Sequence, residues 1–137
     1  DPEIIAQCKK NAEFWGGSFE ETDDMEAAFE GADVVYPKCW GAMDYFAQVD
    51  ENGRIVKKED LDGMQGLFEK NKHWICDEKK MKLIKPTGYY MHCLPADRDM
   101  EVTDEVIDGP QSIVFDEAEN RLHAHKAIMA MTMGGRL

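Results

Sequence analysis

The sequence predicts an α/β fold of three layers, in which helices cover a mostly parallel sheet. Two observations predict this class. Short apolar runs alternate with amphipathic segments, and tight connections join them, which is the order of strands and crossover helices in a parallel sheet. The 137 residues are 43% hydrophobic and 32% charged, a composition typical of one folded domain.

The charge of the chain limits its partners. The formal net charge is −12, and such a surface repels phosphate backbones and anionic lipid. We therefore expect no nucleic-acid partner and no membrane partner, and no apolar run approaches the roughly 20 residues of a membrane span. The chain opens at Asp1 and Pro2 without an initiator Met, so we expect a piece of a longer, cytoplasmic protein.

The cysteines indicate a reduced protein, because none of them forms a CxxC pair. A zinc site is the alternative, since His73 and Cys76, together with His92 and Cys93, offer four ligands. Neighbouring residues on a strand point to opposite faces, which disfavours that site. We expect no metal and no cofactor.

A helix is predicted at the start of the chain. Asp1 caps it, Pro2 begins it and the glycines at 16–17 end it. Its apolar residues recur three or four positions apart and predict one buried stripe. The stripe consists of Ile5, Cys8, Ala12 and Trp15.

Two strands and a second helix follow. Residues 18–21 favour a short strand, and residues 22–24 cap a helix that ends before Gly31. Residues 33–36 favour an apolar strand that Pro37 ends.

The middle of the chain, at about 44–75, departs from this alternation, and we interpret it as an insertion. Residues 50–53 form a turn signal, and the helical spacing of apolar residues at 59–72 predicts a helix. Asp77 caps a further helix that runs to Ile84.

The strand pattern returns at 89–93, and a loop follows at 94–98. Thr103 caps a short helix, and residues 112–115 favour a fourth strand. The last helix is predicted to begin at a capping box of Asp116 and Glu119 and to run to about Met133.

Three strand ends predict where a ligand binds, because open parallel sheets bind ligands at the carboxyl ends of their strands. Cys93 at one end is either a small buried hydrophobe or a thiol that faces the crevice. Lys38 at another is either solvated or an anchor for a ligand carboxylate. Arg121, after the fourth strand, either pairs with neighbouring acids or aims a planar fork at a carbonyl or phosphate oxygen.

Motifs near these ends resemble a known family. The HCLP run at 92–95, EVTDEV at 101–106 and FDEAENRLH at 115–123 are similar to the second domain of the ornithine carbamoyltransferase family. The resemblance implies an enzyme of two α/β domains, of which residues 1–137 are the second, amino-acid-binding one. It also implies a Rossmann-like fold that is truncated at its N-terminal end and lacks its opening strand–helix–strand.

The resemblance implies roles for individual residues. Cys93 and Arg121 would be catalytic contacts of the carbamoyl group, with no covalent intermediate on the thiol. The substrate-binding residues would be Leu94, Lys38, Trp40, His92 and Pro95. Carbamoyl phosphate and an amino acid would be the ligands, and the missing first domain would assemble a homotrimer. A cis peptide at Leu94–Pro95 is expected from the same resemblance.

One stretch departs from the family pattern. Enzymes that act on ornithine carry a D-x-W-x-S-M pattern, whose Asp and Ser hold the α-amino end, whereas this chain has Lys38 and Ala42 at those places. The stretch resembles the knotted branch, which includes N-acetylornithine and N-succinylornithine carbamoyltransferases. The insertion most resembles members of that branch with unassigned substrates from bacterial purine-degradation clusters. Two alternatives stay open at this point: an enzyme for free ornithine, and a non-catalytic α/β module for ligand binding or assembly.

Overall fold

Parallel pairing between two distant segments forms the centre of the fold. The computed structural model describes residues 1–38 and 42–134. Strand β1 (Val34–Val35) pairs in parallel with β4 (Tyr89–Tyr90), with Val34 opposite Tyr89. Ser112 makes a further parallel bridge to Tyr90, so three extended segments lie side by side. The α/β class and the parallel pairing are confirmed.

The sheet is smaller than predicted. Residues 18–21 belong to no strand, because no extended segment of the described chain offers them hydrogen-bond partners. The fourth strand at 112–115 is also wrong beyond Ser112. The Ile113 N–H donates to the Tyr90 carbonyl at 3.0 Å, and helix α6 (Val114–Thr132) begins at the next residue.

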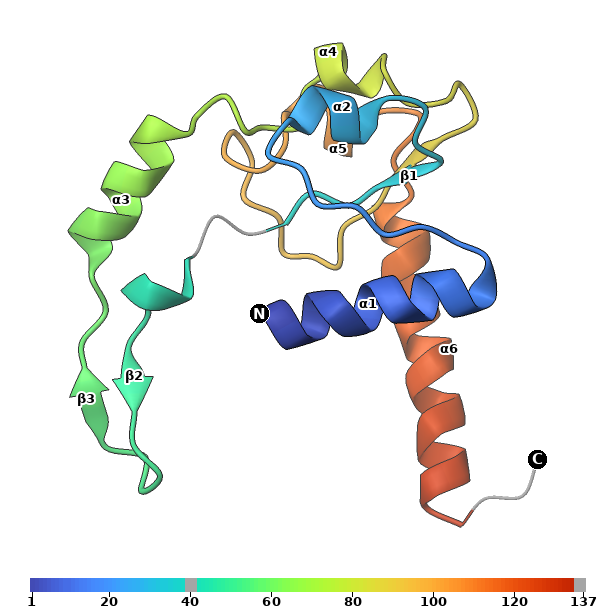
Figure 1. The fold of residues 1–137 in the computed structure, drawn as a ribbon. Coiled ribbons are helices and arrows are strands. Elements are labelled where there is room, and N and C mark those ends of the chain that lie inside the picture. The colour runs from blue at the N-terminus through green and yellow to red at the C-terminus, as the bar shows by residue number, and fades with distance from the viewer. Residues whose placement is uncertain (39–41, 135–137) are drawn as a thin grey trace.

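The start of α6 also overturns the predicted cap. Ile113 is the N-cap, and Asp116 already lies in the first turn. A capping box of Asp116 and Glu119 is therefore wrong, because the sheet pairing of Ile113 decides where the helix begins. Val114 is the buried residue of α6, which extends away from the body of the molecule (Figure 1).

Helix α1 (Pro2–Trp15) is capped as predicted. The Asp1 carboxylate accepts the Glu3 N–H at 2.9 Å, and Gly16 closes the helix with φ at 73°. The predicted buried stripe is wrong, because no residue of α1 is buried and the Trp15 side chain is 81% exposed. The indole lies at the last turn of α1, where no described segment covers it.

Three short helices cover the parallel strands. They are α2 (Met25–Phe29), α4 (Glu78–Met81) and α5 (Asp104–Ile107), and they lie together at one end of the molecule (Figure 1). The core forms between them and the strands and consists of Phe29, Val35, Cys76, Met81, Ile84, Tyr90, Val102, Val106, Ile107 and Val114.

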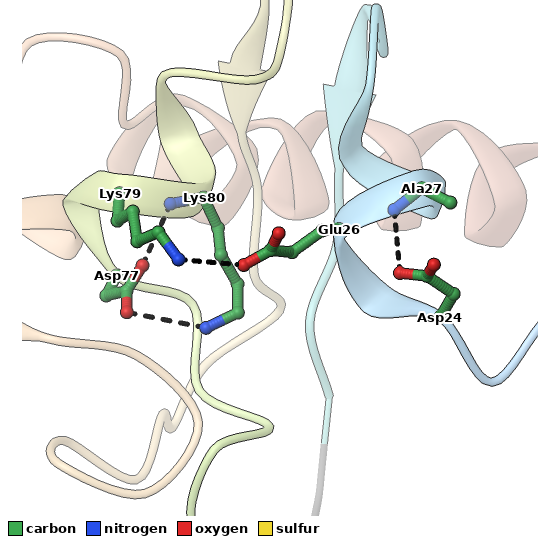
Figure 2. Close-up of polar contacts among 6 residues, drawn as sticks. All are labelled: Asp24, Glu26, Ala27, Asp77, Lys79 and Lys80. Carbon is green, nitrogen blue, oxygen red and sulfur yellow. Dashed lines mark hydrogen bonds and ion pairs between the residues drawn. The ribbon is translucent and has the colours of Figure 1, made fainter.

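Carboxylates organise the junction of α2 and α4, as Figure 2 shows. Asp24 accepts a backbone N–H of α2 at 3.0 Å, and Asp77 accepts the Lys80 N–H at 2.8 Å, so both predicted caps are confirmed. Glu26 on α2 pairs with Lys79 on α4 at 3.0 Å. Lys80 is only 8% exposed, and its ammonium lies 3.4 Å from the Asp77 carboxylate.

Residues 43–70 form an arm that lies to one side of the body (Figure 1). The arm begins with a 3-10 turn, η1 (Met43–Tyr45). Strands β2 (Gln48–Val49) and β3 (Ile55–Lys57) then form an antiparallel hairpin, followed by α3 (Leu61–Lys70). The turn predicted at 50–53 is confirmed, because the Asp50 carboxylate accepts the Asn52 and Arg54 N–H groups at 2.8 and 2.9 Å.

No helix among the described residues is long and apolar enough to cross a membrane.

Candidate functional site

The carboxyl ends of β1 and β4 meet at one edge, as the parallel sheet predicts. The Tyr36 hydroxyl, just after β1, donates to Glu117 Oε1 in the first turn of α6 at 2.8 Å. The same hydroxyl and the Lys38 side chain lie near the Cys93 thiol, which follows β4, and both favour its ionised form. Lys38, Tyr36, Cys93 and Glu117 therefore form one connected group at this edge.

These neighbours set the acidity of the thiol. The pKa of Cys93 lies below its usual value, chiefly because the Tyr36 hydroxyl and then the Lys38 ammonium lie where they can stabilise the thiolate. The one Tyr36 proton bonds to Glu117 in the structure. Glu117 opposes the shift through its negative charge. The pKa of Tyr36 is raised by loss of water around its hydroxyl and by the bond to Glu117, so the tyrosine stays a neutral donor. The thiol thus has a larger thiolate fraction near neutral pH than a free cysteine.

A buried histidine is hydrogen-bonded to the backbone of the turn after β4. His92 is fully buried, and its Nδ1 accepts the Leu94 N–H at 2.9 Å. Its Nε2 lies 3.0 Å from Glu101 Oε2, and the Tyr36 ring stacks on the imidazole with centroids 6.1 Å apart. Leu94 has φ at 53°, in the left-handed region.

The cis peptide expected at Leu94–Pro95 is confirmed. Leu94 is half-buried and Pro95 is exposed. His92, expected to bind substrate, has no exposed surface, so any contact that it makes with a ligand would have to pass through Leu94 or Tyr36.

The remaining predicted site residues are Arg121 and Trp40. Arg121 is exposed on α6, one turn beyond Glu117, and residues four apart share a helix face. Lys38 is exposed at the end of β1. Trp40 lies outside the described residues.

Three residues of the site were not predicted from the sequence. The sequence places Tyr36 in the strand, Glu117 among the acids near Arg121 and Glu101 in a motif of the resemblance. An aromatic hydroxyl at the last position of a strand is the local signal for Tyr36. Glu101 has no such signal, because its role depends on contact with a residue nine positions away.

A cavity of about 410 Å³ adjoins the site on the α2 side. Tyr36 and Lys38 form one part of its wall, and Met25, Trp74 and Glu101 form another. Among the described residues, no group of three or more histidine, cysteine, aspartate or glutamate side chains is arranged to hold a metal ion.

A comparison with protein families places the chain. The profile of the family "Aspartate/ornithine carbamoyltransferase, Asp/Orn binding domain" matches residues 1–132. The chain belongs to this family. The resemblance that the HCLP and DEAENRLH motifs indicate is thereby confirmed at the level of the family.

Curated relatives include enzymes of two specificities. The chain is 44% identical over 135 residues to the ornithine carbamoyltransferase of Thermococcus kodakarensis, covering 98% of this chain and 38% of that protein. It is 41% identical over 134 residues to the N-acetylornithine carbamoyltransferase of Xanthomonas campestris pv. campestris, covering 98% and 36%. The chain therefore spans less than two-fifths of these relatives, and overall identity does not separate the two specificities.

Solved structures that match the chain also include enzymes of both specificities. The ornithine carbamoyltransferase of Pyrococcus furiosus matches with a TM-score of 0.80 at 37% identity, over 100% of this chain and 39% of that one. An N-acetyl-L-ornithine transcarbamylase structure matches with a TM-score of 0.74 at 39% identity, over 94% and 35%. The Asp/Orn-binding fold is thus shared with both.

Proposed function

We propose that this chain is the amino-acid-binding part of a carbamoyltransferase, which transfers the carbamoyl group of carbamoyl phosphate to the amine of an amino acid or an acylated amino acid. The observation that carries the proposal is the meeting of Lys38 with the Cys93–Leu94 turn at one edge of the parallel sheet. Family membership supplies the reaction class. A first domain that binds carbamoyl phosphate and assembles a homotrimer belongs to the same proposal.

The turn after β4 offers polar groups for the reacting centre. The Leu94 N–H already donates to His92, so its carbonyl oxygen is the backbone group that would accept from the carbamoyl NH₂ or the attacking amine. The Cys93 thiol would contact the carbamoyl group beside it. Arg121, on the helix face of Glu117, would donate to the carbamoyl oxygen and stabilise the charge that develops there as the amine attacks and phosphate leaves.

Lys38 determines the proposed substrate class. An α-ammonium and the Lys38 ammonium about 4 Å apart would repel by at most about 4 kcal/mol at an effective dielectric of 20, and by less where water screens them. A lysine instead attracts a carboxylate, or tolerates an α-nitrogen whose charge acylation has removed. We therefore assign the chain to the knotted branch, with an amine-bearing carboxylate or its N-acylated form as substrate.

The alternative substrate is free ornithine. The chain is 44% identical to an ornithine carbamoyltransferase and 41% identical to an N-acetylornithine enzyme, so identity alone does not choose between the two substrates. The two substrates differ in the charge of the α-nitrogen, and Lys38 is the residue whose charge discriminates between them.

The test is a carbamoyl phosphate assay of the natural protein that contains this chain. Ornithine, acetylornithine, succinylornithine and small amino acids are compared as acceptors in the native protein and in Lys38→Asp. We expect turnover of an acylated or carboxylate-rich amine and a shift toward ornithine in Lys38→Asp. Efficient turnover of ornithine by the native protein would overturn the Lys38 argument. Failure with every amine would support a non-catalytic ligand-binding or assembly module.

A further inference from the structure

A buried pair lies directly beneath the candidate site. His92 is 0% and Glu101 5% exposed, and Glu101 Oε2 lies 3.0 Å from His92 Nε2. The same oxygen accepts the Asp97 N–H at 2.9 Å. Glu101 therefore joins the end of β4 to the loop that follows it. We infer that Glu101 is a positioning residue, which holds His92 as the neutral Nε2–H tautomer and thereby fixes the backbone of Leu94. This inference rests on the proposed function only for the contact of the Leu94 backbone with the reacting groups.

The tautomer follows from the hydrogen-bond donors. A backbone N–H can only donate, so the Leu94 N–H at 2.9 Å requires a lone pair on His92 Nδ1. The proton of the neutral ring is then on Nε2, where it is donated to the Glu101 carboxylate. In an imidazolium, the Nδ1–H and the Leu94 N–H would be two donors facing each other, and the hydrogen bond between these groups would be lost. Glu101 thus selects the ring form that can hold Leu94.

The ring has little freedom to reorient. Its two nitrogens are bonded on opposite edges, and the Tyr36 ring covers one face with an interplanar angle of 18°. Leu94 needs such support, because φ of 53° is a conformation that a leucine rarely adopts and that its surroundings must maintain. Loss of the Glu101 acceptor would let the imidazole change tautomer or rotate, and Leu94 would lose its anchor.

The first experiment reads the tautomer without activity. Nitrogen-15 NMR of the His92 ring in the natural protein should show Nε2 protonated and Nδ1 unprotonated, with a slowly exchanging Leu94 amide. In Glu101→Ala we expect a mixed or reversed tautomer and faster exchange at Leu94. In Glu101→Gln both properties should survive, because the amide oxygen can accept both N–H groups. A native ring protonated at Nδ1 would overturn the inference, whatever substrate the protein uses.

The second experiment measures catalysis. Glu101→Ala should lower kcat for carbamoyl transfer by about a hundredfold, the effect of a displacement of about 1 Å at a reacting centre, with KM for carbamoyl phosphate unchanged. Glu101→Gln should restore most of the loss. Glu105→Ala, an exposed glutamate on α5, is the matched control and should behave as the native protein.

The outcomes separate the two hypotheses. An inactive native protein with an Nε2–H ring and a protected Leu94 amide would reject the proposed function and keep the role of Glu101 in holding the turn. An active native protein whose Glu101→Ala variant keeps kcat and the Leu94 protection would reject the positioning role. If Glu101→Ala does not fold, the tautomer of the native protein and the activity of Glu101→Gln test the positioning role instead.

Discussion

The Tyr36 hydroxyl donates a 2.8 Å hydrogen bond to Glu117 Oε1, and this bond connects the end of β1 to the first turn of α6. The two residues are 81 positions apart in the sequence. Because the same hydroxyl also lies near Cys93 and lowers the pKa of its thiol, Tyr36 lies between the acidic residue of α6 and the thiol after β4. The site is therefore assembled by one phenol that contacts both other segments.

Replacing Tyr36 with Phe should raise the pKa of Cys93. The Tyr36 hydroxyl is the first cause of the lowered pKa, and its loss leaves only Lys38 to favour the thiolate. The ring, and with it the stacking on His92, is retained in Tyr36→Phe. The measurement is the rate of Cys93 alkylation as a function of pH, which should show its midpoint at higher pH in the variant. An unchanged midpoint would contradict this effect of the hydroxyl.

Cys93→Ala should lower turnover of the natural protein by about ten- to a thousandfold, since it removes one or two contacts of the transition state. Cys8→Ala is the matched control, because Cys8 is a half-buried thiol on α1. Steady-state kinetics with carbamoyl phosphate and the identified amine measures both variants. Native activity in Cys93→Ala would remove the thiol from the proposed mechanism.

Stability should fall at alkaline pH because of Cys76. Burial, and then the charge of Asp77, raise the pKa of the Cys76 thiol from 9.0 to about 12 in the folded protein. The unfolded chain releases this proton above about pH 9, while the folded chain keeps it. The stabilising contribution is therefore complete below pH 9 and declines toward pH 12, by up to about 1.4 kcal/mol per pH unit. Urea unfolding at pH 8 to 11 should show a shallower decline in Cys76→Ala than in the native protein.

Gly88→Ala should destabilise the sheet. A Cβ at Gly88 would lie 2.9 Å from the Ala32 carbonyl oxygen and 3.0 Å from that of Lys85, and neither backbone group can move freely. We expect a loss of about 1–3 kcal/mol. Gly66→Ala on α3 is the control, because a Cβ there meets nothing within 4 Å and alanine favours helix by up to about 1 kcal/mol. Equal unfolding midpoints for the two variants would contradict the close packing at Gly88.

The isolated chain of residues 1–137 should associate in solution and lack activity. Helix α6 exposes apolar side chains over its length, among them Leu122, Ile128, Met129 and Met131, each at least 50% exposed. Apolar side chains exposed in this number promote association. Sedimentation at several concentrations checks this, and a cooperatively folding monomer would refute it.

Local chemistry explains which parts of the fold the sequence could predict. The caps at Asp1, Asp24 and Asp77 depend on atoms two or three residues away, and all three form as predicted. The start of α6 depends instead on the pairing of Ile113 with Tyr90, which no local pattern contains. Long-range pairing therefore decided the element boundaries that the sequence missed.

The site divides in the same way. Cys93 and Lys38 could be predicted as candidates because parallel strand ends converge, a rule that needs only the order of the elements. Glu117 and Glu101 were missed as site residues because their partners, Tyr36 and His92, are identified only once the chain has folded. Trp15 was predicted to be buried and is exposed. Helical spacing predicts which face of α1 is apolar, but it does not predict which segment covers that face.

The arm at residues 43–70 has a kinetic consequence. Val34 and Tyr89 pair across about 55 residues, and the arm accounts for much of that interval. The pairing can form only after this long loop has closed. The entropic cost of closing the loop therefore comes before the stabilising contacts of the sheet form. A chain in which a short glycine–serine linker replaces the arm should therefore fold faster, with each halving of the loop favouring closure by about 0.6 kcal/mol.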